Sequence, residues 1–274
     1  MNSLSACVDG IGVLGPGLSD WSVACAVLAG ITPYDPRPTV LPVPDSLPPA
    51  ERRRTGRIVR LALAVGLEAT SRAAVHPSHL PTVFSSSGGD GENCHEICQA
   101  LASADRQLSP TRFHNSVHNV AAGYWSIANG ARAPSNALCV FDASFSGGLL
   151  EALSQVAVDR TACLLIAYDS QYPQPLFAQR PIPDAFGVAL LLSAEARPTS
   201  LGWLTARLCD SSPDRLAQPN LESLRLAVPA ARSLPLLLAL ALRATQDVTA
   251  RARQTVVLEY LADLRLAVEV APCS

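Results

Sequence analysis

The sequence predicts an α/β protein with a layered sheet, folded as one domain over residues 1–274. Three observations predict this class. Short apolar strands alternate with helical stretches along the chain, and one strand passes through a turn of small residues directly into a helix. Apolar residues make up 49% of the chain and charged residues only 16%. A chain of 274 residues can bury a sizeable core, and this apolar share also favours a buried subunit interface.

Charge and cysteine content narrow the function classes. The net charge is −2, which gives nucleic-acid binding no support. The N-terminus lacks the basic start of a signal peptide, and the strongly apolar run 234–242 is too short to span a bilayer. Most of the 8 cysteines lie in apolar runs, so we expect free thiols in a reducing cytoplasm. The sequence contains no lysine, which excludes catalysis by a lysine side chain.

The N-terminal part predicts a strand and a turn over 7–18, then a helix over 19–30 capped by Ser19 or Asp20. A proline-rich surface loop fills 31–49, and an arginine-led helix is expected over 51–74. The arginines at its start are interpreted as a solvated helix end, with a docking patch for an acidic partner as the alternative.

Two short motifs in this half have structural interpretations. Gly10, Gly12 and Gly15 loosely match the dinucleotide pattern G-x-G-x-x-G, but Pro16 follows directly and a strand-to-loop transition is expected instead. A strand over 81–87 leads to a helix over 92–104. Its Cys94 and Cys98 share one face, yet no further ligands follow at zinc spacing. We therefore expect neither a metal site nor a cofactor.

The central stretch, residues 109–153, carries the candidate site. It predicts a buried strand over 136–141, a tight turn over 142–148 and a helix from about Leu149. Several enzyme classes present a nucleophile in this way, at a sharp turn whose helix directs its positive N-terminus at nearby negative charge.

The remainder predicts further strands and helices. We expect strands over 161–169, 185–193, 201–209, 255–260 and 264–270, and helices over 151–158 and 233–245. Proline-bearing loops are expected over 170–183 and 212–219.

The central stretch resembles the β-ketoacyl synthases of the thiolase superfamily. There, N-x-V-A-G-x-x-x-I-x-x-G-x-R-x-P-S leads into a strand and D-T-A-C-S-S-G. Here the first motif reads as Asn119 to Gly123, Ile127, Gly130, Arg132 and Pro134-Ser135, and the second as Asp142 to Gly148. The resemblance covers about residues 7–195 and implies a thiolase-like fold. It divides the chain into a complete N-terminal family-like core, 1–197, and a truncated C-terminal half, 198–274.

The resemblance also implies that the chain lacks condensing chemistry. Phe145 stands where the family has its cysteine nucleophile, and a gapless alignment puts Asp142 there instead. Family members use two later histidines to stabilise the decarboxylation and the oxyanion. All 5 histidines of this chain precede the turn. We therefore expect no catalytic residues.

A serine hydrolase or acyltransferase is the alternative function. Ser146 lies in a loose relative of the G-x-S-x-G turn, and Asp169 could orient a base. No histidine follows Ser146, so His114 or His118 would have to act from the opposite sequence order. The structural interpretation of Ser146 is a helix cap.

Noncatalytic relatives of the condensing enzymes are the chain length factors, each paired with an active ketosynthase whose acyl tunnel it shapes. This sequence looks like the short version of aryl-polyene and xanthomonadin-type pathways. The resemblance implies a heterodimer with a ketosynthase, served by an acyl carrier protein. A scaffold that only stabilises the synthase, without setting product length, is a further alternative function. Interface and tunnel positions are then expected at Phe113, His114, Asn115, Val117, His118, Asn119, Tyr124, Trp125, Leu138 and Phe145. For the polar positions among them, the alternative is that their side chains satisfy backbone groups of a loop.

Overall fold

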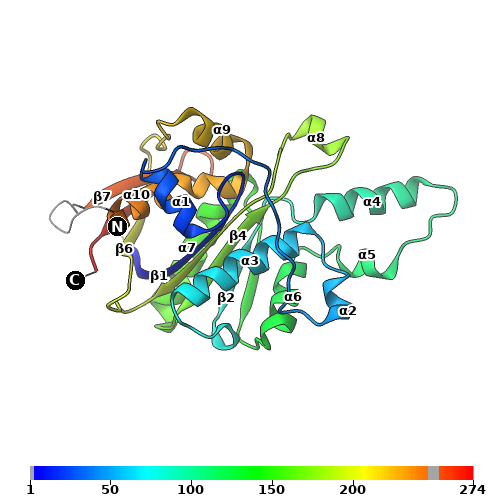
Figure 1. Cartoon of the computed structure of the whole chain (residues 1–274), viewed down its shortest axis with the longest axis horizontal. Coiled ribbons are helices and arrows are strands. Elements are labelled where there is room, and N and C mark those ends of the chain that lie inside the picture. Colours follow the sequence, from blue (N-terminus) through cyan, green and yellow to red (C-terminus); the bar gives the residue numbers. More distant parts are fainter. Residues whose placement is uncertain (1–2, 246–252, 274) are drawn as a thin grey trace.

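The computed structural model describes residues 3–245 and 253–273, which form one mixed sheet with helices on both faces (Figure 1). Its strand order is β3-β2-β4-β5-β1-β6-β8-β7. β2 pairs in parallel with β3 and β4, and the other pairs are antiparallel. The strands are β1 (Leu4–Leu14), β2 (Thr82–Ser85), β3 (Ser135–Leu138), β4 (Cys163–Asp169), β5 (Phe186–Ser193), β6 (Gly202–Cys209), β7 (Gln254–Glu259) and β8 (Arg265–Ala271).

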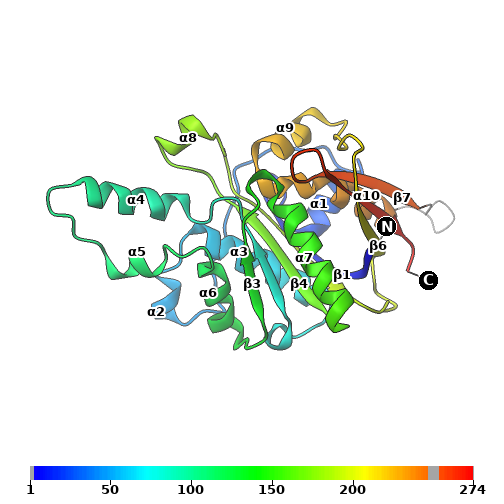
Figure 2. The same ribbon diagram turned by 180° about the vertical axis from the view of Figure 1, so that it is seen from behind.

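Two apolar cores form, one on each face of the sheet. Helices α1, α7 and α10 cover one face, around Leu149, and α3 and α6 cover the other, around Trp125 (Figures 1 and 2). The helices are α1 (Trp21–Leu28), α2 (Pro49–Arg52), α3 (Arg57–Arg72), α4 (Gly91–Ala102), α5 (Pro110–His114), α6 (Val120–Asn129), α7 (Ser144–Asp159), α8 (Leu176–Gln179), α9 (Pro219–Ala227) and α10 (Leu234–Thr245), with short 3-10 turns η1 (Pro77–His79), η2 (Phe141–Ala143) and η3 (Pro229–Ser233). No described helix is both long and apolar enough to traverse a membrane.

The glycines of β1 serve close packing. A Cβ at Gly12 would lie 2.0 Å from the carbonyl oxygen of Val65 on α3, and one at Gly10 would lie 2.1 Å from that of Ala69. Helix α3 therefore rests directly on the strand backbone. The glycine pattern that loosely matched a nucleotide motif therefore belongs to a strand and the turn after it, as expected. Its Gly10 and Gly12 form the surface on which a helix packs.

Gly12→Ala should destabilise the protein by about 1–3 kcal/mol, because the opposing atom is backbone and cannot turn aside. Gly123→Ala on α6 is the matched control. A Cβ there meets nothing within 4 Å, and we expect a gain of about 1 kcal/mol from helix propensity. Urea unfolding measures both variants. Equal midpoint shifts for the two would contradict this packing.

Most predicted elements are confirmed, with three corrections. The expected helix over 51–74 is two helices, α2 and α3, separated by residues 53–56. Asn115 donates from Nδ2 to the Arg54 carbonyl oxygen at 2.8 Å, and Gly56 is the N-cap of α3. The local sequence pattern cannot show that a distant side chain hydrogen-bonds a backbone carbonyl. The continuous apolar periodicity therefore suggested one helix.

The other two corrections concern the central stretch. The strand over 136–141 was expected to be buried, but β3 ends at Leu138 and its residues are exposed or half-buried. The following helix was expected from about Leu149 and begins at Ser144. Gly147 and Gly148 suggested a turn, yet they lie within α7. A Cβ on either would lie 2.6–2.8 Å from side chains of Val140 or Leu165, so they bring the helix close to the sheet.

Candidate functional site at the elbow and the open sheet edge

The turn between β3 and α7, which we call the elbow, is held by Ser144. Its Oγ accepts a hydrogen bond from the Val140 backbone N–H at 3.1 Å and donates to the Phe141 carbonyl oxygen at 2.7 Å. Phe141 has a positive φ of 50° and its side chain is 62% exposed. A non-glycine residue rarely adopts this conformation, so the surrounding contacts must hold it there.

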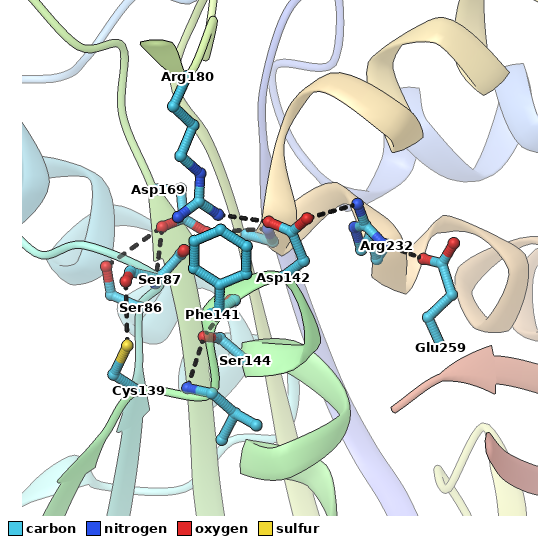
Figure 3. A network of polar contacts seen from close by, with 12 residues as sticks. Ser86, Ser87, Cys139, Phe141, Asp142, Ser144, Asp169, Arg180, Arg232 and Glu259 are labelled. Carbon is cyan, nitrogen blue, oxygen red and sulfur yellow. Dashed lines mark hydrogen bonds and ion pairs between the residues drawn. The ribbon is translucent and has the colours of Figure 1, made fainter. Parts of the chain in front are cut away.

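Asp142 lies in this turn between two guanidinium groups (Figure 3). Arg180, at the end of α8, pairs with one carboxylate oxygen, and Arg232, on η3, pairs with the other at 3.0 Å. The guanidinium of Arg180 also lies 3.8 Å from the ring centre of Phe141. Two ion pairs leave this carboxylate poorly suited to act as a nucleophile.

The ion pairs continue into the C-terminal part of the chain. Arg232 contacts Glu259 of β7 at 2.7 Å, and Arg225 of α9 contacts the same carboxylate at 3.1 Å. Arg225 also binds Glu222 through two parallel bonds of 2.7 and 2.8 Å, and this hydrogen bonding lowers the pKa of Glu222. We call the series from Arg180 through Asp142 to Glu222 the arginine–carboxylate ladder. It ties the elbow to β7 and α9.

Asp169, at the end of β4, is a buried carboxylate next to the elbow. It accepts hydrogen bonds from the backbone N–H groups of Ser87 at 2.8 Å and Ala230 at 2.9 Å, and from the Ser86 hydroxyl at 3.3 Å. Desolvation by complete burial raises its pKa from 3.8 to about 7, although the three hydrogen bonds oppose the shift. The side chain thus joins the end of β2 to η3.

The raised pKa of Asp169 predicts a pH-dependent stability. Between pH 4 and 7 the folded state binds a proton that the unfolded state has released, so the free energy of unfolding falls as pH rises. From pH 5 to pH 8 the loss should be on the order of 2–3 kcal/mol. The side chain of Asp169→Asn is neutral at every pH. This variant should therefore lose the dependence of its unfolding free energy on pH, even though it is less stable than the wild type at pH 5. Urea midpoints at both pH values measure it, and equal slopes in the two proteins would contradict the assignment.

Neither alignment of the family motif places a usable nucleophile at the elbow. Asp142 is held in the ladder, and Phe145 is 1% exposed within the core around Leu149. Phe145 was expected at the tunnel or interface. The structure buries it in the chain's own core instead, because α7 starts early enough to turn this position inward.

Ser146 is buried in the first turn of α7, where it is 2% exposed. The N-cap position belongs to Ala143, which makes no side-chain cap bond, so the expected capping role of Ser146 is wrong. Within the described residues no hydrogen bond joins Ser146 to a histidine. Asp169, its possible partner in a triad, is engaged with backbone amides. The arrangement gives a serine hydrolase no support.

The polar residues of 113–119 mainly bind the backbone. Besides its bond to Arg54, Asn115 accepts a hydrogen bond from the Tyr124 hydroxyl at 3.3 Å. His118 Nε2 lies 3.1 Å from the carbonyl oxygen of Leu138, at the end of β3. The interpretation that such side chains satisfy loop groups therefore describes Asn115 and His118.

An apolar pocket of about 600 Å³ opens beside these residues, and we call it the α5–α6 pocket. Phe113 is 67% exposed at it and Val117 51% exposed. Its lining consists of Pro110, Phe113, His114, Val117, Asn119, Val120, Gly123, Tyr124 and Ile127. Five of the expected interface or tunnel positions thus line one pocket. Trp125 is not among them: it is 1% exposed and packs edge-on against Phe84 in the core.

The two edges of the sheet differ in whether their outer backbone groups are hydrogen-bonded. At β7, the Asp214 backbone N–H donates to the Val257 carbonyl oxygen, and the Asp214 carboxylate accepts from the Val257 N–H, both at 2.8 Å. That edge is covered by its own loop. β3 pairs only with β2 among the described strands, which leaves its outer backbone groups available for another strand.

The register shows which groups of β3 face outward. The carbonyl oxygens of Pro134 and Leu138 accept from β2, at 3.0 and 3.2 Å. Backbone groups alternate in direction along a strand, so those of Ser135 and Ala137 face away from β2. Leu138, the expected pairing position, is therefore bound to its own sheet by its backbone.

Sequence reasoning missed the ladder. Arg180 lies in a proline-bearing loop and Arg232 in a short 3-10 turn, and nothing in the sequence around either residue marks it as a partner of Asp142.

The described residues contain no group of three or more His, Cys, Asp or Glu placed to hold a metal ion. A larger groove of about 1220 Å³ lies between β1, α1 and the proline-rich loop. There Glu68 pairs with Arg72, and Asp35 with Arg37.

Comparison with solved structures identifies the fold. A ketosynthase in complex with its chain length factor, ApeO and ApeC from Xenorhabdus doucetiae, is similar at TM-score 0.71 and 23% identity, covering 97% of this chain and 99% of that chain. The ishigamide ketosynthase/chain length factor gives TM-score 0.72 and 16% identity over 99% of this chain and 100% of that chain. AntDE:AntF, a type II polyketide synthase carrier protein with its ketosynthase, is similar at TM-score 0.76 and 12% identity. The match covers 98% of this chain and 99% of that chain.

A search of curated proteins finds no match. The family model for the β-ketoacyl synthase N-terminal domain matches residues 28–253. The mixed sheet between two helical layers, as the described residues form it, agrees with the thiolase-like fold of the solved structures. The chain therefore belongs to the β-ketoacyl synthase family and has its thiolase-like fold.

Proposed function

We propose that this chain is a noncatalytic chain length factor, which pairs with an active β-ketoacyl-carrier-protein synthase and shapes the tunnel for the growing acyl chain. The observation that carries the proposal is the elbow. A family member that catalyses condensation needs a nucleophile there, and here the candidate positions hold a doubly ion-paired Asp142 and a buried Phe145.

The surface beside the elbow supports a role in pairing. The edge strand β3 is open, and the apolar α5–α6 pocket lies close to it, with His118 joining the two regions. An open strand edge presents unpaired backbone groups to which another strand can add. The partner in this proposal is a ketosynthase, which receives substrate from an acyl carrier protein. Two of the similar structures are of a ketosynthase with a chain length factor, and a third is of a carrier protein with its ketosynthase.

An aryl-polyene pathway is the finer part of the proposal. It rests on the sequence resemblance at FHNSVHN, GYWSI and DASF. A plain scaffold would pair in the same way but would leave product length unchanged in variants of the pocket.

Purified alone, the chain should neither decarboxylate malonyl-carrier protein nor condense it. Mixed with a candidate β-ketoacyl synthase encoded in the same gene neighbourhood, it should be required for products of full length. A fluorophosphonate probe should leave Ser146 unlabelled. Decarboxylation by the isolated chain, absent from a mock preparation, would contradict the noncatalytic role, and a labelled Ser146 would favour the hydrolase.

A further inference from the structure

Helices α4 and α5 form an arm that projects from the body of the molecule (Figures 1 and 2). We call residues 91–114 the α4–α5 arm. Only Gly91 and Asn93 are buried in α4, and no residue is buried in α5. The two helices are joined to each other chiefly by polar contacts: Asn93 donates to the Arg112 carbonyl oxygen at 2.9 Å, and Arg112 pairs with Glu96.

The free side of α4 carries an apolar stripe. Cys94, Ile97, Cys98 and Leu101 follow the spacing i, i+3, i+4, i+7 of one helix face. Both cysteines are exposed, and Leu101 is 50% exposed. The α5-facing side, through Asn93 and Glu96, is turned by roughly 120° from this stripe. An apolar stripe on a projecting helix lacks the cover that amphipathic helices normally have within a fold.

Both ends of the arm are fixed near the end of β3. His118, just after α5, contacts the Leu138 carbonyl oxygen at 3.1 Å, and its ring is 3.3 Å from where a Cβ on Gly89, just before α4, would lie. Figure 2 shows the arm on the β3 side of the sheet, projecting away from β6 and β7. A chain that adds a strand to β3 therefore comes to lie next to the arm.

The arm is long enough to reach well over such a partner. Helix α4 has 12 residues and so is about 18 Å long. Strands in a sheet are about 4.8 Å apart, so a helix of this length lying across added strands would cover nearly four of them.

We infer that the α4–α5 arm clasps the partner ketosynthase, with the stripe of Cys94, Ile97, Cys98 and Leu101 packed on the partner's surface. This inference rests on the proposed function and adds a second contact to it, separate from the pairing of β3. The occupant is the ketosynthase of the proposed function, because the arm lies on the β3 side of the sheet, where that partner's strand would pair. A second copy of this chain at the same edge is one of the outcomes that the test below distinguishes.

The two stripe cysteines provide a direct test. The isolated chain and its complex with the ketosynthase are treated with N-ethylmaleimide, and the labelling rate of each cysteine is read from its peptide by mass spectrometry. In the complex, the rates at Cys94 and Cys98 should fall at least about tenfold, as expected for thiols removed from solvent. The half-buried Cys209 on β6 is the internal control and should keep its rate.

Each outcome decides a different point. A complex of the expected mass in which Cys94 and Cys98 react as in the free chain would overturn the arm's role and leave the proposed function standing. Failure to form any complex would overturn the proposed function and the inference with it. Protection in the isolated chain that grows with its concentration would assign the arm to a second copy, which also overturns the inference.

A pair of substitutions tests the stripe independently. Leu101→Glu places a charge on the stripe and should weaken the complex at least about tenfold, whereas Gln99→Glu, on the opposite exposed side of α4, should change the Kd less than about twofold. Both residues are exposed, so folding should be unaffected. Equal Kd values for the two variants would contradict the inference.

Discussion

Ala137→Pro should break the complex with the ketosynthase while leaving the fold of the isolated chain intact. Proline removes the backbone N–H of Ala137, which faces away from β2 and would donate to the partner strand. A buried acceptor left without its donor costs about 1–3 kcal/mol, or roughly 5- to 150-fold in Kd, and the ring adds a steric clash at the paired edge. Isothermal titration of the variant with the ketosynthase measures the loss.

Two controls separate pairing from folding. Ala137→Gly keeps the N–H and should keep most of the affinity. Leu138→Pro removes a donor that faces β2, so it should lower the stability of the isolated chain as well as the affinity. If Ala137→Pro binds as tightly as Ala137→Gly, β3 is not the pairing strand.

Gly123→Leu should shorten the product without dissociating the complex. Gly123 lines the α5–α6 pocket, and a Cβ added there meets nothing within 4 Å, so the new side chain can enter the pocket. A leucine side chain adds four carbon atoms to an apolar space of about 600 Å³. We expect the main product to lose one or more two-carbon extension units, measured by mass spectrometry of the released acyl chains.

Gly123→Ala is the control for helix propensity, since it stabilises α6 with little loss of pocket volume. Val117→Phe, at the exposed side of the same pocket, should act in the same direction as Gly123→Leu. Unchanged product length with both bulky variants, in complexes of normal stability, would favour the plain scaffold.

The strands could be predicted from the sequence because β4 and β5 are buried on both faces and appear as unbroken apolar runs. The edge strand could not be bounded, because Cys139, Val140 and Phe141 continue the apolar run beyond β3 into the turn. Apolar character alone cannot distinguish an edge strand from a buried one.

The candidate site was predicted in part. The segment around Phe113 and Val117 is local in sequence, and the family resemblance pointed to it. The ladder joins Asp142 to Arg232, 90 residues away, and only the folded chain brings them together. Trp125 was misplaced because an aromatic residue on a helix can face either the core or a partner, and the register of α6 decides which.

The proposed pairing is measured by native mass spectrometry of this chain mixed with a candidate β-ketoacyl synthase from its gene neighbourhood. We expect a one-to-one complex, formed by the wild type and by Ala137→Gly and lost in Ala137→Pro. A wild-type chain that remains unbound at micromolar concentrations of both proteins, or a complex that Ala137→Pro leaves intact, would contradict it.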